Sequence, residues 1–199
     1  MRGRARAAAR TRARIIDAAH TLLDRPGDTG LTLQEVAAAA GVTRATIYKS
    51  LGSRRELLAA VFENQGRRIE YERVRAVGGL ADPGEAVLET VRESCRAWSL
   101  TPEAIRKTLA LSVVDAEVGD LVARYEGYRR AEMMAVARRA YEAGVLGDGV
   151  TLEHAGAVLG LVTSFAAFDV LRVDGVSVAT EHLVRTARAA LEIGFRKGS

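Results

Sequence analysis

The stretch that most constrains the fold runs over residues 32–62 and reads TLQEVAAAAGVTRATIYKSLGSRRELLAAVF. Thr32 and Glu35 have the spacing of a capping box, which starts a helix by satisfying its first backbone N–H groups. Gly41 is placed to end that helix in the left-handed conformation, and Thr43 can cap a second, short helix. Two helices joined by a glycine turn, the second with cationic outward positions, predict a helix-turn-helix, whose second helix enters the major groove of DNA.

The surrounding run, from residue 11 to about residue 64, resembles the DNA-binding domain of the TetR (tetracycline-repressor) family of bacterial transcription regulators. The helix-turn-helix carries the likeness, together with IYKSLGSRRELL, which is similar to the family's tyrosine-x-x-phenylalanine-glycine-serine-lysine-x-x-leucine stretch. Ser50 and Leu51 stand where histidine and phenylalanine are usual, and Arg54 stands where lysine is usual. Arg54 keeps the positive charge and Leu51 keeps an apolar side chain.

The rest of the chain predicts an all-α protein of about nine helices. The 199 residues are rich in Ala, Leu, Arg and Glu, hold only 3 prolines and show no strand pattern of useful length. We divide the chain into a basic disordered arm (residues 1–10), a helix-turn-helix DNA-binding domain (11–64) and a C-terminal helical domain (65–199) for ligand binding and dimerisation. The ligand-binding and dimerisation roles are implied by the resemblance.

Helix boundaries outside the motif follow from caps, prolines and apolar periodicity. The helix that starts at Ser53 is expected to continue toward Arg75, and Asp82-Pro83 and Thr101-Pro102 each open a helix. A long helix is expected from about Val118 to Ala143, then one over residues 152–171 and a last one ending near Phe195. The last helix is expected to begin near Ser177, and a loop is expected over residues 24–30, before the motif.

Charge is spread unevenly and points to DNA. Residues 1–55 hold 11 Arg or Lys against 4 Asp or Glu, a net charge of +7, so the remainder of the +4 chain carries −3. A basic N-terminal segment followed by a mildly acidic remainder predicts a DNA-binding domain attached to a domain with another role. The arginine-rich start could reach a minor groove or a phosphate backbone, or it could be a solubilising tail.

Several classes of protein are disfavoured. The longest apolar run, residues 155–168, is too short to span a bilayer, and the basic start lacks the apolar core of a signal peptide, so we expect no membrane partner. The single cysteine, Cys95, excludes an internal disulfide and fits a cytoplasmic location. The isolated histidines and serines show neither metal spacing nor a nucleophile signature, so we expect no cofactor, no metal and no catalytic site.

The predicted DNA contacts lie on and around the second helix of the motif. Arg44, Ala45 and Thr46 are at its N-terminal end, where base edges are usually reached, and Arg44 suits guanine. The other contacts are assigned to phosphates, with Arg54 in the position of the family's phosphate-binding lysine and Thr32 at a helix N-terminus. The full set is Thr32, Thr43, Arg44, Ala45, Thr46, Tyr48, Lys49 and Arg54.

The resemblance also implies an effector pocket in the C-terminal domain. Its candidate lining residues are Cys95, Trp98, Tyr125, Tyr128, Phe165, Phe168 and Asp169. Aromatic residues at helical spacing are equally typical of a packed core. Asp169, in an apolar helix, could face a cationic ligand, or it could pair with an arginine such as Arg172 or Arg188.

A dimer surface is expected on the last two helices, which are rich in small and apolar residues. The candidates are Val158, Leu159, Val162, Leu183, Ala187, Ala190 and Leu191, with Gly194 continuing the seam. Two such helices from each chain would make the four-helix bundle through which the family usually dimerises. The alternative is that these helices form the core of a monomer.

Together these features predict a homodimeric transcription regulator that binds double-stranded operator DNA. The favoured form is a repressor that a small, largely apolar effector releases from a palindromic operator. An activator modulated by a ligand is an alternative within the same class. A non-specific architectural DNA-binding protein is an alternative from another class, which the acidic remainder of the chain disfavours.

Overall fold

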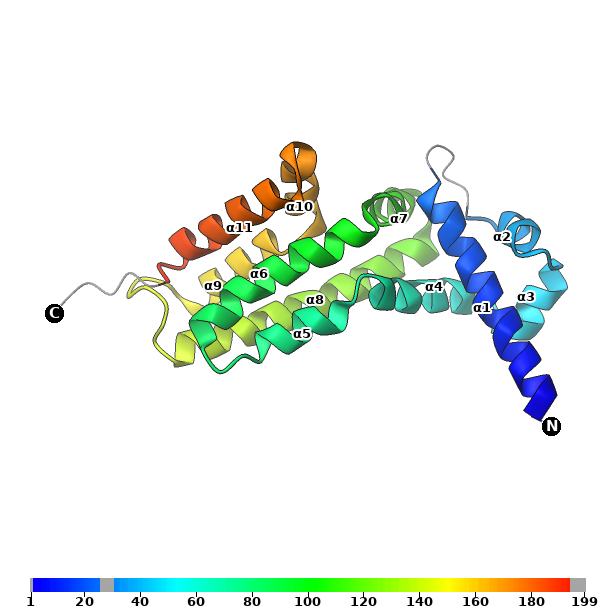
Figure 1. Cartoon of the computed structure of the whole chain (residues 1–199), viewed down its shortest axis with the longest axis horizontal. Helices are drawn as coiled ribbons and strands as arrows, with labels where there is room; N and C mark the ends of the chain where they lie inside the picture. Colours follow the sequence, from blue (N-terminus) through cyan, green and yellow to red (C-terminus); the bar gives the residue numbers. More distant parts are fainter. Residues whose placement is uncertain (1, 26–30, 194–199) are drawn as a thin grey trace. The chain divides into compact units, whose positions relative to one another are not determined.

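The computed structural model describes residues 2–25 and 31–193, and this part of the chain contains eleven α-helices, one 3-10 turn and no strand (Figure 1). The all-α prediction is confirmed, with more and shorter helices than the nine expected. The helices are α1 (Arg2–Asp24), α2 (Leu33–Ala40), α3 (Arg44–Leu51), α4 (Arg54–Arg68), α5 (Tyr71–Gly78), α6 (Pro83–Leu100), α7 (Pro102–Val114), α8 (Ala116–Glu142), α9 (Leu152–Val162), α10 (Phe165–Leu171), the 3-10 turn η1 (Arg172–Asp174) and α11 (Val176–Ala190).

These helices form two compact units. The first unit comprises Met1–Arg68 and Thr101–Ala123, and the second comprises Ile69–Leu100 and Arg124–Ser199. Helix α8 therefore contributes its first turns to the first unit and the rest to the second. The division made from the sequence kept residues 101–123 with the C-terminal domain, whereas in the structure α7 and the start of α8 pack with the helix-turn-helix.

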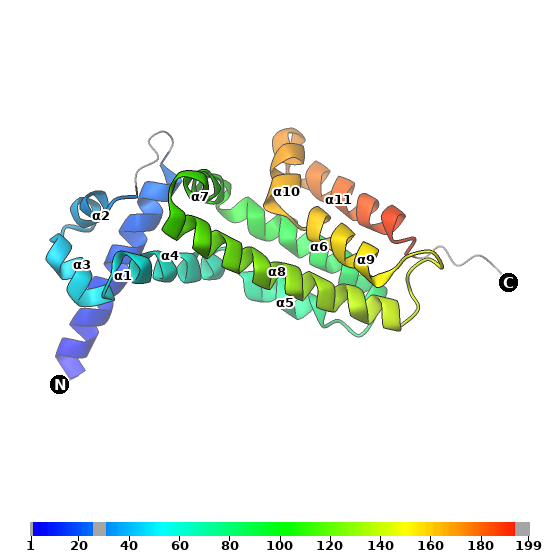
Figure 2. The same ribbon diagram turned by 180° about the vertical axis from the view of Figure 1, so that it is seen from behind.

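Helix α1 is the centre of the first unit. It packs against α2, α3, α4 and α7, and the first three of these can be followed beside it in Figure 2. The shared core contains Ile15 and Ala19 of α1, Val36 of α2 and Ile47 of α3, each fully buried. Burying such side chains stabilises the fold by about 1.5–3 kcal/mol each for the larger ones, so the motif is anchored on α1.

The start of α1 differs from the disordered arm expected over residues 1–10. The helix begins at Arg2, and residues 3–10 are helical with exposed side chains. Alanine and arginine have high helix propensity, so this segment extends a helix whose later turns are fixed by packing. The loop expected over residues 24–30 lies largely outside the described residues, because the description stops at Arg25 and resumes at Leu31.

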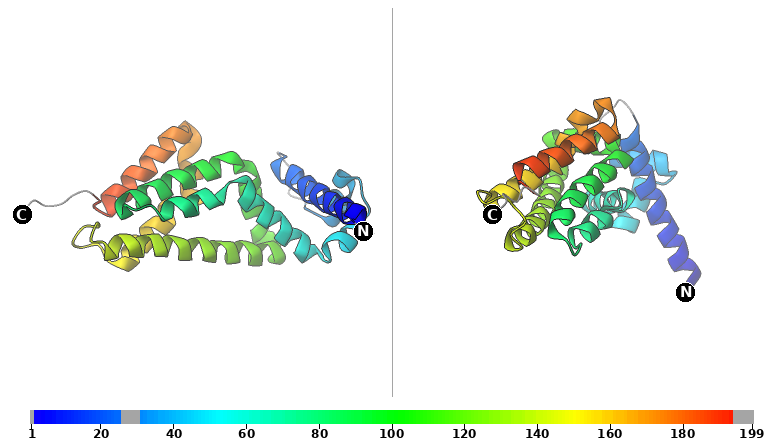
Figure 3. Two further views of the ribbon diagram at one scale, coloured as in Figure 1. Left: turned by 60° about the horizontal axis from the view of Figure 1, so that its bottom comes forward. Right: turned by 60° about the vertical axis from the view of Figure 1, so that its left-hand side comes forward.

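In the second unit, α6 is the central helix. It packs against α5 and α11, as can be followed in Figure 3 with α11 in orange to red. Pro83 opens α6 and Pro102 opens α7, as predicted, and Gly144 follows α8 in the left-handed conformation at φ 64°. Thr151 caps α9 by accepting a hydrogen bond from the His154 N–H at 3.1 Å. Local caps therefore fix most helix ends.

Two expected helices are interrupted. The helix after Ser53 ends at Arg68, and Glu70, at φ 52°, separates α4 from α5 where a continuous connector toward Arg75 was expected. The helix expected over residues 152–171 breaks into α9 and α10 at Thr163–Ser164, where the Ser164 hydroxyl caps α10 by accepting the Ala167 N–H at 3.1 Å. Helix α11 ends at Ala190, and Gly194 and Phe195 lie outside the described residues.

Buried donors satisfy the carbonyl groups that the α9–α10 break releases. The Trp98 indole donates to the Thr163 carbonyl at 2.9 Å, and the Arg129 guanidinium donates to the Gly160 carbonyl at 3.1 Å and to the Thr163 hydroxyl at 2.9 Å. Arg129 is only 7% exposed and also pairs with Glu126 at 2.9 Å. Because unpaired buried polar groups cost about 1–3 kcal/mol each, these donors stabilise the break.

Over the described residues, no single helix is long and apolar enough to cross a bilayer. The segments Leu152–Val162 and Phe165–Asp174 reach that threshold only when taken together, and the chain bends by 52° between them.

Candidate nucleic-acid interface

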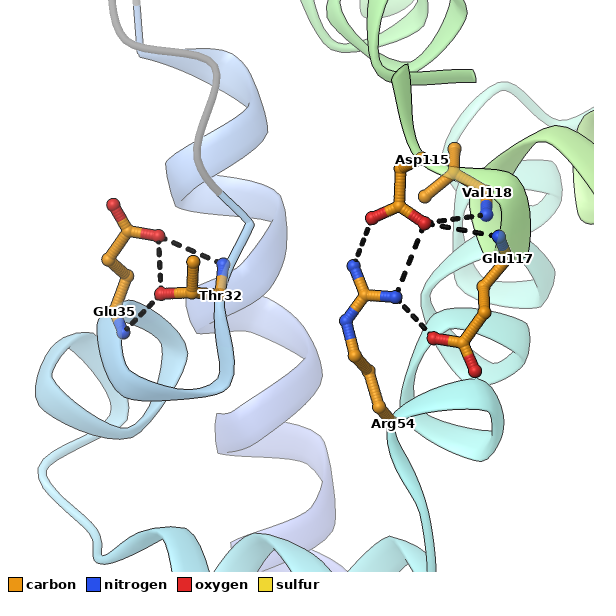
Figure 4. Close-up of polar contacts among 6 residues, drawn as sticks. All are labelled: Thr32, Glu35, Arg54, Asp115, Glu117 and Val118. Carbon is orange, nitrogen blue, oxygen red and sulfur yellow. Dashed lines mark hydrogen bonds and ion pairs between the residues drawn. The ribbon is translucent and has the colours of Figure 1, made fainter. Parts of the chain in front are cut away.

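Side-chain caps and one glycine build the helix-turn-helix. The Thr32 hydroxyl accepts the Glu35 N–H at 3.2 Å, and the Glu35 carboxylate accepts the Thr32 N–H at 2.9 Å, which completes the predicted capping box (Figure 4). Gly41 ends α2 at φ 61°, in the left-handed region where a side chain would be strained. The tight turn that follows sets the start of α3.

Helix α3 buries one side and exposes the other. Ile47 and Leu51 are buried in the first unit, whereas Arg44, Ala45, Tyr48 and Lys49 are exposed. Residues three and four positions apart are neighbours on a helix surface, so these four side chains form one continuous surface. The predicted base-contacting and phosphate-contacting residues of α3 are thus brought together on a face that solvent reaches.

Two threonines of this region serve the helix itself. The Thr43 hydroxyl accepts the Thr46 N–H at 3.2 Å and lies 2.9 Å from the Thr46 hydroxyl. Thr43 is exposed and Thr46 is half-buried. Their hydroxyl groups therefore stabilise the first turn of α3, and an exposed hydroxyl that caps a helix can still accept a further hydrogen bond.

Thr32 and Arg54, both predicted to contact phosphates, are held by carboxylates of the protein (Figure 4). The Thr32 hydroxyl donates to Glu35 at 2.7 Å, and these bonds lower the pKa of the Glu35 carboxyl, so a negative charge lies at the N-terminus of α2. A phosphate would be repelled there. Arg54 is bonded to Asp115 and Glu117. Both side chains have protein partners in this structure, and their contacts with DNA stay a prediction.

Residues from outside the predicted domain hold the helix-turn-helix in place. Lys107 of α7 donates to the Leu22 carbonyl at 2.8 Å, near the C-terminus of α1, and Gln65 of α4 bonds to Thr101. A cation near the carboxyl end of a helix is stabilised by the helix dipole. Sequence reasoning missed these partners, because they are separated by 85 and 36 residues and follow no local pattern.

Most candidates for the effector pocket form packed core in the second unit. The Trp98 ring meets Phe165 edge to face with centroids 6.1 Å apart, Phe168 lies 6.4 Å beyond, and all three are buried. Cys95 is also buried, and this burial raises the pKa of its thiol to about 11. This arrangement matches the packed-core alternative for these four residues.

The remaining pocket candidates are at or near the surface. Tyr125 and Tyr128 stack edge to face with centroids 6.1 Å apart, and Tyr128 is 58% exposed. Asp169 accepts from Arg172 at 2.7 Å, so the ion-pair alternative holds for this residue. Their part in ligand binding stays a prediction.

A groove of about 500 Å³ lies elsewhere in the second unit, between α5 and α8. It is lined mainly by apolar atoms, with the Arg75–Glu132 ion pair at 2.6 Å on its wall and Arg139 bonded to the Leu80 carbonyl at 2.8 Å. None of the predicted pocket residues lines it. Its walls are Val74, Arg75, Gly78, Gly79, Glu132, Met133, Ala135, Val136 and Arg139.

The dimer seam expected on the last helices faces the interior of the protomer. Five of its candidates are buried within the single protomer, and their part in a dimer stays a prediction: Leu159, Val162, Leu183, Ala187 and Leu191. Val158 and Ala190 are half-buried. The apolar periodicity marked a buried face, and this protomer's own helices bury it. Exposed apolar side chains lie instead at Leu161, Val170 and Val173, which are 65%, 73% and 80% exposed.

Across residues 2–25 and 31–193, no group of three or more His, Cys, Asp or Glu side chains could hold a metal ion. The first unit presents an exposed cationic helix, set on a buried core and capped at both ends.

Comparison with known proteins identifies this helix-turn-helix. Residues 15–61 match the family model for bacterial regulatory proteins of the tetR family. The HTH-type transcriptional regulator BetI of Rhizobium meliloti (strain 1021) is 31% identical over 96 residues, which cover 48% of this chain and 47% of that protein. The BetI regulator of Agrobacterium fabrum (strain C58) is 27% identical over 165 residues, covering 75% and 80%. The chain thus spans about half the length of the first of these relatives.

Solved structures extend the likeness to the whole fold. A TetR-family transcriptional regulator from Rhodococcus sp. superposes with a TM-score of 0.71 at 19% identity, covering 92% of this chain and 99% of that one. A transcriptional regulator from Saccharomonospora viridis, solved in complex with choline, gives a TM-score of 0.66 at 17% identity, covering 92% and 96%. Residues 15–61 of this chain thus match the tetR family of bacterial regulatory proteins, and its helices follow the fold of solved regulators of that family.

Proposed function

We propose that this protein is a homodimeric transcription regulator that binds operator DNA through α3 of each protomer, most directly as a repressor that a small effector releases. The exposed surface of Arg44, Ala45, Tyr48 and Lys49 is the observation that carries the proposal. It lies on a helix whose opposite side is anchored in the core, as a recognition helix requires. The relatives are regulators rather than enzymes, which agrees with a binding role.

Sequence-specific binding is tested by selecting bound duplexes from a random DNA pool. The affinity of the selected duplexes is then measured as a function of salt concentration. We expect an inverted repeat, since a two-fold dimer presents two α3 helices about 34–36 Å apart. Arg44→Ala should cost about 1–3 kcal/mol and relax the preference at one base position. Arg138→Ala, an exposed arginine of α8, is the matched control. Enrichment of no sequence would favour the architectural alternative.

The dimer is proposed to form through exposed apolar side chains near α9, α10 and η1. Ala157 and Leu161 are four residues apart on an exposed strip of α9, and Val170 and Val173 are exposed beyond the break. Leu161→Asp should convert a dimer to a monomer in sedimentation equilibrium without loss of helix signal. Val113→Asp, at a similarly exposed valine of α7, controls for the added charge. A dimer that survives Leu161→Asp places the interface elsewhere.

Effector release is the finer part of the proposal. The groove between α5 and α8 supports a ligand site in the second unit, and the choline complex of the Saccharomonospora viridis regulator makes choline a reasonable first probe. An effector lowers operator affinity by its differential affinity for the two states of the protein. Operator affinity is therefore measured with and without choline and a panel of apolar compounds. An affinity that stays unchanged across the panel removes the effector from the proposal. A cytoplasmic location follows from the proposed role.

A further inference from the structure

Arg54, the first residue of α4, is enclosed by two carboxylates. Its guanidinium faces Asp115 with both terminal nitrogens, one contact at 3.4 Å and one shorter, and the first nitrogen also bonds to Glu117 (Figure 4). The side chains of Arg54 and Asp115 are 29% and 25% exposed, so solvent screens this cluster only in part. The bond to Asp115 raises the pKa of Arg54, and the Arg54 guanidinium lowers the pKa of Asp115, so these two groups stay charged near neutral pH.

Asp115 is held in place from its other side. It follows the last residue of α7, and its Oδ1 accepts the N–H groups of Glu117 at 3.1 Å and Val118 at 3.3 Å, at the start of α8. The carboxylate is therefore fixed by backbone donors and presents both oxygens to Arg54. A guanidinium forms bidentate hydrogen bonds with a carboxylate or with a phosphate in the same geometry. The carboxylates of this cluster therefore occupy the hydrogen-bond donors with which Arg54 would bind a DNA phosphate.

The charge of the cluster also matters. One guanidinium and two carboxylates sum to −1, so a phosphate that approaches Arg54 meets a net negative group. Arg54 stands one residue after Ser53 and three after α3 ends at Leu51, at the position where the family resemblance places a phosphate-binding cation. The same side chain thus has two possible anionic partners, one inside the protein and one on DNA.

We propose that Asp115 and Glu117 compete with operator phosphate for Arg54 and so restrain DNA binding from within the first unit. This inference rests on the proposed function, because it assumes that the protein binds DNA. When Arg54 is released from the two carboxylates, it can contact one DNA phosphate in each protomer. Each such contact steepens the slope of log affinity against log salt by about 0.9, equivalent to about five- to tenfold tighter binding at 0.1 M salt.

The test measures the affinity of the full-length protein for its selected duplex by fluorescence anisotropy from 0.05 to 0.5 M KCl, with a random-sequence duplex as the probe if selection yields none. The variants are Asp115→Asn, which keeps an oxygen to cap α8, Glu117→Gln, and the two combined. Asp120→Asn is the matched control, because it removes one negative charge from an exposed position of the same helix without touching Arg54.

We expect the combined variant to bind about five- to tenfold more tightly per contact at 0.1 M salt, with a steeper salt slope. Adding Arg54→Ala should abolish the gain, and Asp120→Asn should show none. Unchanged or weaker binding by the combined variant overturns the proposal and leaves the cluster a structural clamp. A gain that survives Arg54→Ala, or that Asp120→Asn reproduces, overturns it as well, since it reflects only the lost charge.

Stability is monitored in parallel by the helix signal and by thermal unfolding. If the combined variant unfolds, Glu117→Gln alone decides, because that residue's side chain caps no helix and is 42% exposed. Absence of DNA binding by both the wild type and the variants defeats the proposed function. Binding by the wild type with no gain in the variants defeats only the competition.

Discussion

His20 should make the stability of the protein fall steeply in mild acid. Its side chain is fully buried in α1, and over the described residues neither ring nitrogen has a hydrogen-bond partner. Burial lowers its pKa from 6.5 to about 4, and the positive charge of Arg68 acts in the same direction, while Asp24, Asp17 and the nearby Val61 backbone oppose it. The imidazole is therefore neutral in the folded protein at neutral pH, and charging it inside the core is unfavourable.

The size of the effect follows from proton linkage. Between pH 6.5 and 4 the unfolded chain holds a proton at this histidine that the folded chain lacks, so the free energy of unfolding falls as the pH falls. With these two pKa values the loss reaches about 2–3 kcal/mol at pH 4.5 and about 3 kcal/mol at pH 4. Since a domain has only about 5–15 kcal/mol of stability, such a loss is readily measured.

The assay is urea unfolding followed by far-ultraviolet circular dichroism between pH 7.5 and 4.5. His20→Leu replaces both unpaired nitrogens by apolar atoms, so at pH 7.5 its stability should stay within about 1 kcal/mol of the wild type. At pH 4.5 it should keep the roughly 2–3 kcal/mol that the wild type loses. His154→Gln, at an exposed position, should follow the wild type. Parallel curves for His20→Leu and the wild type, or a His20 resonance that titrates near 6.5, would refute this reasoning.

Three further predictions concern the second unit. Ser164→Ala removes the cap of α10 and should lower the free energy of unfolding by about 1 kcal/mol in urea titrations, whereas Ser177→Ala, at an exposed serine of α11 with no cap bond, should change it little. Trp98→Phe keeps an aromatic ring but leaves the Thr163 carbonyl unpaired, so we expect a loss of about 1–3 kcal/mol by circular dichroism; a stability equal to the wild type would mean that water replaces the indole. Cys95 is buried and its pKa is about 11, so a thiol reagent at pH 8 should label it no faster than the protein unfolds, and rapid labelling of the native state would contradict its burial.

Features with a local sequence signal were predictable. Thr32 with Glu35, Gly41, Thr43 and Thr151 each act within three or four residues, so spacing alone gave the helix ends that the structure confirms. The exposed face of α3 was predictable in the same way, because its apolar residues Ile47 and Leu51 lie on one side and are buried, which leaves the polar residues on the other side.

The interruptions at Glu70 and at Thr163–Ser164 carried no comparable signal. The apolar run through residues 155–168 reads as one helix, because the donors that stabilise its break, Trp98 and Arg129, come from distant parts of the sequence. Apolar periodicity likewise shows that Leu183 and Ala187 are buried without showing which chain buries them. The partners of Arg54 lie 61 and 63 residues away, so its engagement could not be read from the helix-turn-helix.

The break between α9 and α10 also has an evolutionary consequence. Trp98, Arg129 and Ser164 each supply a hydrogen bond that is useful only because the helix is interrupted there. A substitution of one of these residues leaves a buried carbonyl or N–H group without its hydrogen-bond partner. Selection should then favour either reversion of that substitution or further changes that remove the other two residues. In related proteins that keep the kink these three positions should be inherited as a set, and where α9 runs straight into α10 all three are free to drift.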